Sequence, residues 1–401
     1  MNYIELNNQV IIRDENGKYQ LNKDKEALKS YLEDYIEPKM KKFDNLNDRL
    51  NYLVENDYYS KEILDLYDQY VIDVIYDFIR AKNFKFQSYM SASKFYQNYA
   101  LKSNDGEEIL ENYEDKVLIV ALTLGNGEPK LAKDIAEKLI NQEFQPATPT
   151  FLNAGRARGG KMVSCFLVNV EDSCEGISYA VSSANHLSKI GGGVALNLTR
   201  LRASGESIKG IKGAAGGVMG VAKLLEQSFS YFNQMGARQG AGAVYLNVLH
   251  PDFETLLDSK KINADEKIRL TTLSIGAIIP DKFMELAEKN EKCYAFYPHS
   301  IYQKYGVHLD GIKMDEWYDK LANDDEIEKK EINPRELLTR IAQTQQESGY
   351  PYVVFIDSAN EQHTLKDVGM IKMSNLCCEI FQYQTPSDIK GYGQVSNWGQ
   401  D

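Results

Sequence analysis

Hydrophobic side chains recur at helical spacing in the first part of the chain. The stretch 60–79, SKEILDLYDQYVIDVIYDFI, predicts one long helix, because apolar and aromatic residues recur there every three or four positions. The face that we expect to be buried contains Ile63, Leu66, Tyr67, Tyr70, Val71, Val74, Ile75 and Phe78. A second helix is predicted for 129–142, PKLAKDIAEKLINQ, with a proline at its start and one apolar stripe of Leu131, Ile135 and Leu139.

The hydrophobic pattern changes after residue 150. Short apolar runs typical of buried strands alternate there with helical stretches at 220–234 and 281–290, which predicts parallel strands covered by helices. The expected strands are VSCFLVNV, GVALNL, GAVYLNV, LSIGAII and YPYVVFI, at 163–170, 193–198, 242–248, 273–279 and 350–356. We therefore expect a mostly helical domain at 1–150 and an α/β layer or barrel at 151–401. The acidic run at 323–333 is expected to be a solvated surface segment.

Composition narrows the class of protein. With 401 residues, 43% of them hydrophobic, the chain is long enough to bury a large core. A formal net charge of -12 disfavours a protein that coats nucleic acid or an anionic membrane, although a local basic pocket for one nucleotide is compatible with it. The start MNYIELNNQV resembles no secretion signal, and no apolar run is long enough to span a bilayer. We expect a cytoplasmic protein.

Cysteine and histidine spacing argues against a metal site. The five cysteines include no C-x-x-C pair, and the five histidines stand far apart. An odd number of cysteines in a large chain without a secretion signal is also atypical of a disulfide framework. We expect free thiols, no metal bound by this chain alone, and any metal to be on a partner.

The stretch 374–381, SNLCCEIF, contains two adjacent cysteines between an amide and a carboxylate. If it is an extended strand, Asn375, Cys377 and Glu379 share one face, because side chains alternate along a strand. Three interpretations compete: a buried thiol pair, a vicinal disulfide, or a reactive Cys377 with polar neighbours. The spacing alone favours the first.

A second group of polar residues surrounds the expected strand 163–170. Thr148 is expected in a turn, Ser164 and Cys165 within the strand, and Asp172 just past its end. Active sites of parallel α/β sheets gather at the carboxyl ends of strands, so this group suggests chemistry. The plainer alternative is that Cys165 is a small buried hydrophobic residue.

Two glycine-rich stretches match neither common phosphate-binding motif. The triplet 191–193 is not G-x-G-x-x-G, and no G-x-x-x-x-G-K-[ST] occurs. The triplet would still permit the backbone to approach a ligand closely. The stretch 236–242, GARQGAG, suits a segment that orders around a ligand, with an ordinary surface loop as the alternative.

Several long motifs occur in an order that resembles the large subunit of aerobic ribonucleotide reductase, with class Ib as the most similar form. They are FQPATPTFLN, SCFLVNVEDS, SKIGGGVALNLTRLRASG, GARQGAGAVYLNVLHPD, NADEKIR and SNLCCEI. The resemblance extends from the N-terminal helices to about Asp401. It implies that a helical domain is followed by the first half of a ten-stranded α/β barrel.

The resemblance implies thiyl-radical reduction of ribonucleoside diphosphates. Cys377 matches the cysteine that becomes a thiyl radical and removes the 3′ hydrogen, and Glu379 matches the base for the 3′-hydroxyl. Asn375 matches the amide that holds the substrate hydroxyls. Cys165 matches one of two cysteines that reduce the 2′ position and then form a disulfide. The other is expected beyond Asp401.

The resemblance also implies ligand sites. Thr148 and Ser164 resemble residues that contact the substrate phosphate and ribose, and Gly193 resembles a backbone contact. The residues that resemble an allosteric site for ATP or a deoxynucleoside triphosphate are Asp172, Arg202, Gln234 and Arg238.

The partners implied by the resemblance are a radical-generating small subunit with a metal-dependent cofactor, a glutaredoxin- or thioredoxin-like reductant, and a second copy of the large subunit. A complementary C-terminal half is also expected, because an open half-barrel would expose its apolar interior and unpaired strand edges. The alternative is a catalytically incomplete fragment that only binds effector nucleotide or a complementary chain.

Overall fold

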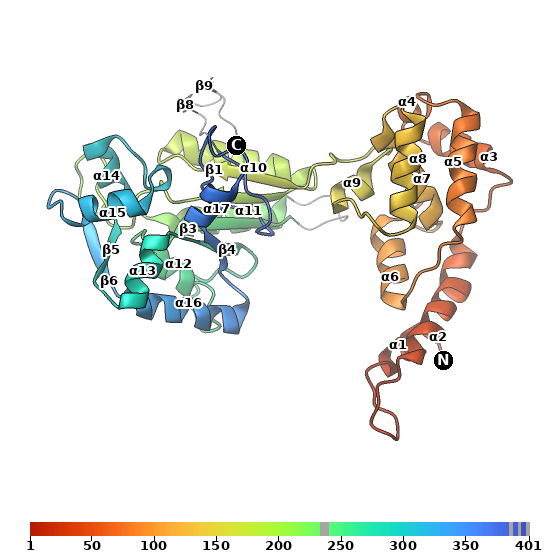
Figure 1. Ribbon diagram of the computed structural model, residues 1–401, viewed down its shortest axis with the longest axis horizontal. Coiled ribbons are helices and arrows are strands. Elements are labelled where there is room, and N and C mark those ends of the chain that lie inside the picture. The colour runs from red at the N-terminus through yellow and green to blue at the C-terminus, as the bar shows by residue number, and fades with distance from the viewer. Residues whose placement is uncertain (233–239, 385–387, 392–393, 398–401) are drawn as a thin grey trace. The chain divides into compact units, whose positions relative to one another are not determined.

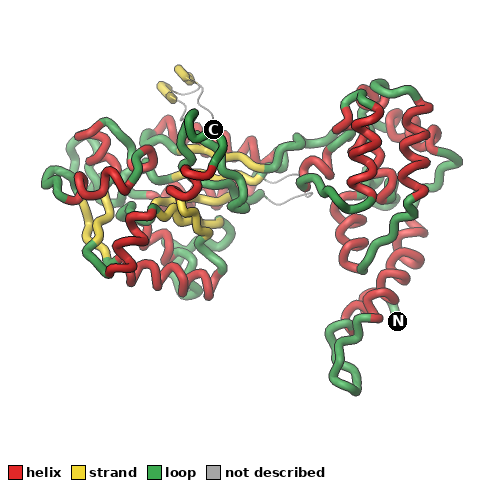
Figure 2. Tube along the Cα trace, in the orientation of Figure 1, coloured by secondary structure: helices red, strands yellow, loops and turns green. Residues whose placement is uncertain are grey.

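The computed structural model describes residues 1–232, 240–384, 388–391 and 394–397 (Figure 1). The chain divides into two compact units, Met1–Ser164 and Cys165–Asp401. The division lies later than the expected boundary at residue 150, because α9 (Thr148–Asn153) packs against α7 (Tyr113–Gly125) of the first unit. Figure 2 shows that the first unit contains helices and loops, whereas the second also contains strands.

The first unit is built around α7. Its residues Val117 to Leu122 are all buried, so this helix is apolar on every side and lies in the centre of the unit. Asn112 caps its start by accepting a hydrogen bond from the amide of Asp115 at 2.9 Å. The elements α4 (Lys61–Leu64), α5 (Gln69–Ala81), α8 (Pro129–Ile140) and α9 contact α7. The other elements of the unit are α1 (Tyr3–Gln9), α2 (Asn22–Ser30), η1 (Tyr31–Ile36), η2 (Glu37–Lys39), α3 (Leu46–Glu55), α6 (Tyr89–Lys94) and η3 (Phe95–Tyr99).

The prediction of one helix over 60–79 is wrong. The chain forms α4 and α5 instead, with a turn between them, and the buried residues of α5 are Ile72, Ile75, Tyr76 and Ile79. Tyr70 is 77% exposed, because α5 contains two interleaved stripes with helical spacing and the other one faces the core. The helix at 129–142 is confirmed as α8, but it buries Ala132 and Ala136 and leaves Leu131 exposed.

The second unit contains a parallel sheet that confirms the predicted fold class, a helical region followed by an α/β layer. The strand order is β1-β2-β3-β4-β7, and every neighbouring pair is parallel. All five predicted strands are present, as β1 (Cys165–Asn169), β2 (Gly193–Asn197), β3 (Gly242–Asn247), β4 (Ser274–Ile279) and β7 (Tyr352–Phe355). Within the described residues the sheet is open rather than closed into a barrel.

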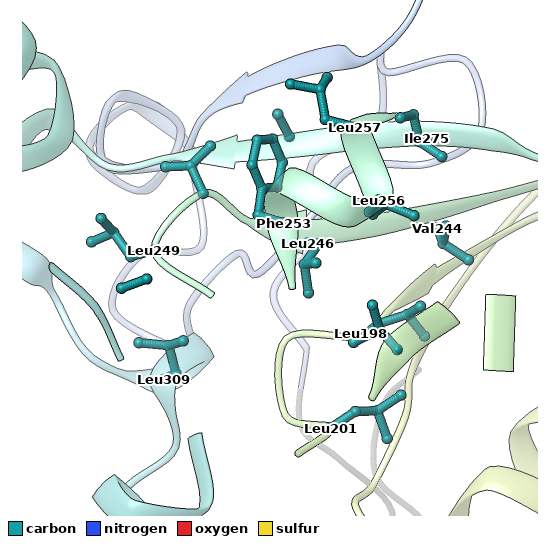
Figure 3. Packing of buried hydrophobic residues seen from close by; sticks show 14 of the residues in the cluster. Leu198, Leu201, Val244, Leu246, Leu249, Phe253, Leu256, Leu257, Ile275 and Leu309 are labelled. Carbon is teal, nitrogen blue, oxygen red and sulfur yellow. The ribbon is translucent and has the colours of Figure 1, made fainter. Parts of the chain in front are cut away.

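Helices cover one face of this sheet. Alternate residues such as Val244, Leu246 and Ile275 point from the strands into a core that includes Phe253 (Figure 3). The helices of this unit are α10 (Cys174–Lys189), α11 (Val218–Tyr231), α12 (Phe253–Asp258), α13 (Asp281–Lys289), α14 (Pro298–Tyr305), η4 (Leu309–Gly311), α15 (Met314–Ala322), α16 (Pro334–Ser348) and α17 (Ile356–Gln362). The predicted helices 220–234 and 281–290 correspond to α11 and α13.

The segment 371–384 covers the opposite face of the sheet. Met373 and Leu376 from this segment pack against a second apolar cluster that includes Leu167, Ala195 and Tyr245. These strand side chains are at most 4% exposed. The expectation of an exposed apolar interior is therefore wrong for these residues, because the chain folds its own segment over them.

The acidic run at 323–333 is more structured than expected. Lys329–Ile332 forms β6, which pairs antiparallel with β5 (Cys293–Phe296). Ile327 and Ile332 are buried, so two apolar residues anchor a run whose charges otherwise face solvent. A further antiparallel pair consists of β8 (Asp388–Gly391) and β9 (Gln394–Asn397). Across the described ranges, no helix is long and apolar enough to cross a membrane.

The packing between β3 and β4 predicts a steric limit at Gly276. A Cβ atom there would lie 2.2 Å from the ring of Tyr245, so Gly276→Ala should lower the free energy of unfolding by roughly 1–3 kcal/mol. Urea denaturation followed by tryptophan fluorescence measures this, since both tryptophans follow residue 164. The matched control is Gly220→Ala in α11, where a Cβ meets nothing within 4 Å. Equal stability of the two variants would contradict the packing argument.

Candidate active site

The stretch 374–381 forms a turn, so the predicted strand is wrong. The amide of Cys378 donates to the carbonyl of Asn375 at 3.1 Å, and Cys378 has a φ of 65°. A left-handed residue ends any extended run, because side chains no longer alternate past it. The turn places Cys377 at an exposed position. None of the five cysteines is in a disulfide, which argues against the vicinal disulfide, and the exposure of Cys377 argues against a buried thiol pair.

The side chain of Asn375 organises this turn. It is completely buried, and its Oδ1 accepts hydrogen bonds from the amides of Glu379 and Ile380, each at 2.9 Å. Its backbone carbonyl accepts a hydrogen bond from the hydroxyl of Tyr245 at 2.7 Å. A buried amide with its oxygen satisfied in this way is fixed in orientation, so its nitrogen points in a defined direction.

That nitrogen donates to Cys165. Asn375 Nδ2 lies 3.1 Å from Cys165 Sγ, and the same sulfur lies 3.8 Å from Glu379 Oε1. The structure therefore brings together three of the four predicted catalytic residues, an amide, a thiol and a carboxylate. Cys165 begins β1 rather than ending it, so the expectation that the site lies at the carboxyl ends of the strands is wrong for this group.

Cys377 is the fourth predicted catalytic residue. It precedes Glu379 by two positions, and its charge is one of the smaller causes that raise the pKa of Tyr352, burial of Tyr352 being the largest. Leu376, the residue before it, packs against the backbone of Gly193, where an added Cβ would lie 2.8 Å from Leu376 Cδ2. The group that approaches the backbone of Gly193 closely is thus Leu376 of the cysteine turn.

The remaining predicted substrate residues belong to the first unit. Thr148 is the first residue of α9 rather than part of a turn, and its Oγ1 lies 3.1 Å from the hydroxyl of Tyr99. The end of α9 is held by Lys116, whose Nζ donates to the carbonyl of Leu152 at 3.1 Å. Burial lowers the pKa of Lys116 to about 7. Ser164 is half-buried and immediately precedes β1.

Asp172 and Arg202, the predicted effector residues, form an ion pair at the other end of the sheet. Arg202 Nε lies 2.5 Å from Asp172 Oδ2, and the backbone amide of Arg202 donates to Oδ1 at 3.1 Å. Both residues line a pocket of about 480 Å³, together with Lys209, Gly217 and residues at the start of α10. The lining contains the cations Arg202 and Lys209 and a helix N-terminus, which suit an anionic ligand, beside the carboxylates of Asp172 and Glu175.

Two buried carboxylates that the sequence did not indicate support the wall of this pocket. Asp252 accepts hydrogen bonds from the amides of Ser204 and Val218, each at 3.0 Å. Glu206 accepts from the amide of Ala203 at 2.9 Å, and burial raises the pKa of Glu206 to about 7. Only the contacts of Asp252 and Glu206 in the structure show that these residues support the pocket wall. Tyr245 was missed for the same reason, since its hydroxyl meets a backbone atom far away in the sequence.

Other predictions concern residues that the structure does not describe or groups that it does not show. Gln234 and Arg238 lie outside the described residues. Among the residues that are described, no group of three or more histidine, cysteine, aspartate or glutamate side chains is arranged to hold a metal ion.

Three family models together match most of the chain. Residues 163–392 match the family model for the ribonucleotide reductase barrel domain, residues 3–84 the ribonucleotide reductase N-terminal model, and residues 85–159 the all-alpha domain model. These matches follow one another without overlap. All three models belong to the family that the motifs of the sequence resemble.

Relatives from two bacteria carry the same family name. The chain is 50% identical over 399 residues to the ribonucleoside-diphosphate reductase subunit alpha of Bacillus subtilis, covering 100% of this chain and 57% of that protein. It is 51% identical over 376 residues to the NrdEB subunit alpha of the same organism, covering 94% of this chain and 35% of that protein. The subunit alpha of Mycoplasma pneumoniae is 45% identical over 366 residues, covering 91% of this chain and 50% of that protein.

The chain therefore spans about half the length of these relatives or less. Within that span, the barrel-domain model alone covers more than half of the chain, and it includes Cys165, Asn375, Cys377 and Glu379. The chain belongs to the ribonucleotide reductase family.

Proposed function

We propose that the chain is the N-terminal part of a ribonucleoside-diphosphate reductase catalytic subunit of the class Ib type, which reduces ribonucleoside diphosphates by thiyl-radical chemistry. The observation that carries this proposal is the contact of the Asn375 amide and the Glu379 carboxylate with the sulfur of Cys165. A neutral donor, a carboxylate and a thiol around one point are the groups that removal of a ribose hydroxyl requires.

Each side chain has a proposed role at the ribose. Cys377, as a thiyl radical, removes the 3′ hydrogen, and Glu379 takes the proton of the 3′-hydroxyl. Asn375 holds the hydroxyls and sets the distance between Cys165 and Glu379. Cys165 donates a proton to the departing 2′-hydroxyl and then enters a disulfide with a second thiol, which we place outside these 401 residues. Thr148, Ser164 and Gly193 are proposed substrate contacts.

The proposed chemistry needs partners. The radical on Cys377 comes from a small subunit that holds a metal-dependent cofactor, and a glutaredoxin- or thioredoxin-like protein restores the dithiol. A complementary chain supplies the second thiol, and two copies of the large subunit pair. We expect this assembly in the cytoplasm, where nucleotide substrates and reducing conditions coexist.

The Asp172–Arg202 pocket is proposed to bind ATP or a deoxynucleoside triphosphate as an allosteric effector. Its volume of about 480 Å³ falls in the range of small-molecule sites, and Arg202 and Lys209 provide positive charge for phosphates. Gln234 and Arg238 are proposed to relay the identity of the effector to the substrate base.

A second candidate function is a fragment that only binds effector nucleotide or a complementary chain. It is favoured by one observation: the lining of the Asp172–Arg202 pocket lies within a single unit, whereas Cys165 forms no disulfide within the described part of the chain.

Removing the thiol of Cys377 should abolish turnover. When the chain is combined with a complementary C-terminal segment, a radical subunit, a reductant, an effector and a ribonucleoside diphosphate, Cys377→Ser should form no detectable deoxynucleotide, because an alcohol cannot replace the thiyl radical. Cys378→Ser is the matched control and should keep activity within about threefold. Equal activity of the two variants, measured as deoxynucleotide formed per minute, would contradict the assignment.

Removing the hydroxyl of Tyr245 should slow turnover without weakening substrate binding. Tyr245→Phe deletes the hydrogen bond to the Asn375 carbonyl, worth about 1 kcal/mol, so kcat should fall roughly fivefold while KM stays unchanged. Tyr350→Phe, which loses a hydrogen bond to Ser274, is the control and should leave kcat unchanged. A rise in KM with normal kcat would argue against a positioning role for Tyr245.

Neutralising the effector pocket should weaken nucleotide binding to the isolated chain. Arg202→Ala removes a cation from the lining of the pocket, so the Kd for dATP measured by calorimetry should rise at least about tenfold. Lys289→Ala removes an exposed cation of α13 and should leave the Kd unchanged. Binding that survives Arg202→Ala at full strength would place the effector elsewhere.

A further inference from the structure

A mostly buried group of four charged side chains is connected along the chain both to the effector pocket and to the cysteine turn. Arg200 Nε lies 2.9 Å from both carboxylate oxygens of Asp310, and Arg200 Nη1 lies 2.5 Å from Glu171 Oε1. Lys372 Nζ lies 3.9 Å from Asp310 Oδ2. We call Arg200, Asp310, Glu171 and Lys372 the ion cluster. Neither composition nor motif spacing indicated it, and the function proposed above does not use it.

The ion cluster is balanced in charge, and three of its four members are deeply buried, whereas the side chain of Glu171 is 26% exposed. The side chains of Arg200, Asp310 and Lys372 are 5%, 1% and 8% exposed. Two cations face two anions, and Asp310 accepts a further hydrogen bond from Asn197 Nδ2 at 3.3 Å. Buried charges tolerate separation poorly, because an unpaired charge in the interior costs several kcal/mol. A displacement of one member therefore tends to displace the others.

Two backbone segments connect the ion cluster to the effector pocket. Glu171 immediately precedes Asp172, and Arg200 is separated from Arg202 only by Leu201. These residues follow the carboxyl ends of β1 and β2, which pair in parallel. A nucleotide phosphate that competes with Asp172 for Arg202 would shift both segments, and the salt bridge of Arg200 with Glu171 spans them.

The opposite side of the ion cluster connects to the cysteine turn. Lys372 lies in the segment 371–384, shortly before Asn375, and the backbone between them is buried at Met373 and Ser374. Because Met373 packs in the apolar cluster under the sheet, this stretch has little freedom to absorb a movement of Lys372. A shift at Asp310 is then transmitted to the turn that presents Cys377.

We propose that Asp310 and Lys372 are positioning residues through which occupancy of the Asp172–Arg202 pocket alters the presentation of Cys377. This inference rests on the proposed effector site. It adds a route that ends at the cysteine, distinct from the proposed relay to the substrate base through Gln234 and Arg238. Asp310 and Lys372 touch no reacting atom in this account and act only through the turn.

The test measures alkylation of Cys377 in the full 401-residue chain. Iodoacetamide labelling is followed by mass spectrometry that separates Cys377 from Cys378, with and without saturating dATP, whose Kd is measured separately by calorimetry. In the unmodified chain, dATP should change the Cys377 labelling rate at least about fivefold, the lower end of common allosteric couplings. In Lys372→Met, the Kd should stay within about twofold and the labelling rate should no longer respond to dATP.

Two further variants complete the experiment. Asp310→Asn should give the same loss of response, and Lys372→Met remains informative if Asp310→Asn unfolds, as judged by circular dichroism. Asp258→Asn removes a carboxylate from Arg340 at 2.8 Å outside the ion cluster and is the matched control, which should retain the full response. A normal dATP response in folded Lys372→Met would overturn the inference, as would dATP binding that leaves Cys377 labelling unchanged in the unmodified chain. If dATP does not bind at all, the effector site itself is refuted, and this inference with it.

Discussion

The hydrogen bonds of one buried amide hold the candidate active site together. The oxygen of Asn375 accepts from two backbone amides of its own turn, and its nitrogen donates to Cys165, which begins a strand more than two hundred positions earlier. Removing this side chain would deprive the amides of Glu379 and Ile380 of their acceptor and would remove the hydrogen bond that joins the turn to Cys165. The distance between Cys165 and Glu379 therefore depends on Asn375, and so does the chemistry proposed for them.

The sheet provides the fixed surface on which that amide acts. Five parallel strands bury one face under helices and the other under the segment 371–384, whose Met373 and Leu376 enter the apolar cluster beneath the strands. Gly193 permits this approach, because any side chain there would collide with Leu376. The same segment thus completes a core and presents Cys377. The packing of the core and the proposed catalysis therefore depend on the same segment.

The opposite end of β1 and β2 has a different chemical character. Ion pairs replace apolar contacts there, and Asp172 and Arg202 line an open pocket while Arg200 and Asp310 are buried behind it. The strands therefore separate a thiol site at their amino ends from a charged site at their carboxyl ends. Such an arrangement allows one ligand to act on another without contact between them, provided that the intervening groups move together.

Sequence patterns predicted the regular elements well and the local details poorly. All five strands of the sheet were predicted, because apolar runs bounded by glycine and polar residues admit few other structures. The buried face of α5 was not predicted, because two stripes of residues on this helix have the same spacing. Only tertiary packing decides which of the two stripes is buried. The turn at Cys377 was also mispredicted, because strand alternation takes no account of side-chain hydrogen bonds such as those of Asn375.

The catalytic candidates depended on the family resemblance. Nothing in the spacing of Cys165 and Asn375 indicates that they meet, since their contact results from the whole path of the chain between them. Tyr245, Asp310 and Lys372 belong to no sequence motif, because the partners that single them out lie far away in the sequence. The hydrophobic pattern thus predicted the fold class, and the family resemblance predicted the residues of the candidate site. The proposed positioning residues could be found only from the structure.

The most direct measurement is a crystal structure of the reduced chain with a ribonucleoside diphosphate bound. Our account predicts that the ribose lies beside the cysteine turn, with its hydroxyls in hydrogen-bond range of Asn375 and Glu379 and with the sulfurs of Cys165 and Cys377 facing it. A ribose found away from the turn, or an Asn375 amide turned away from Cys165, would contradict the account.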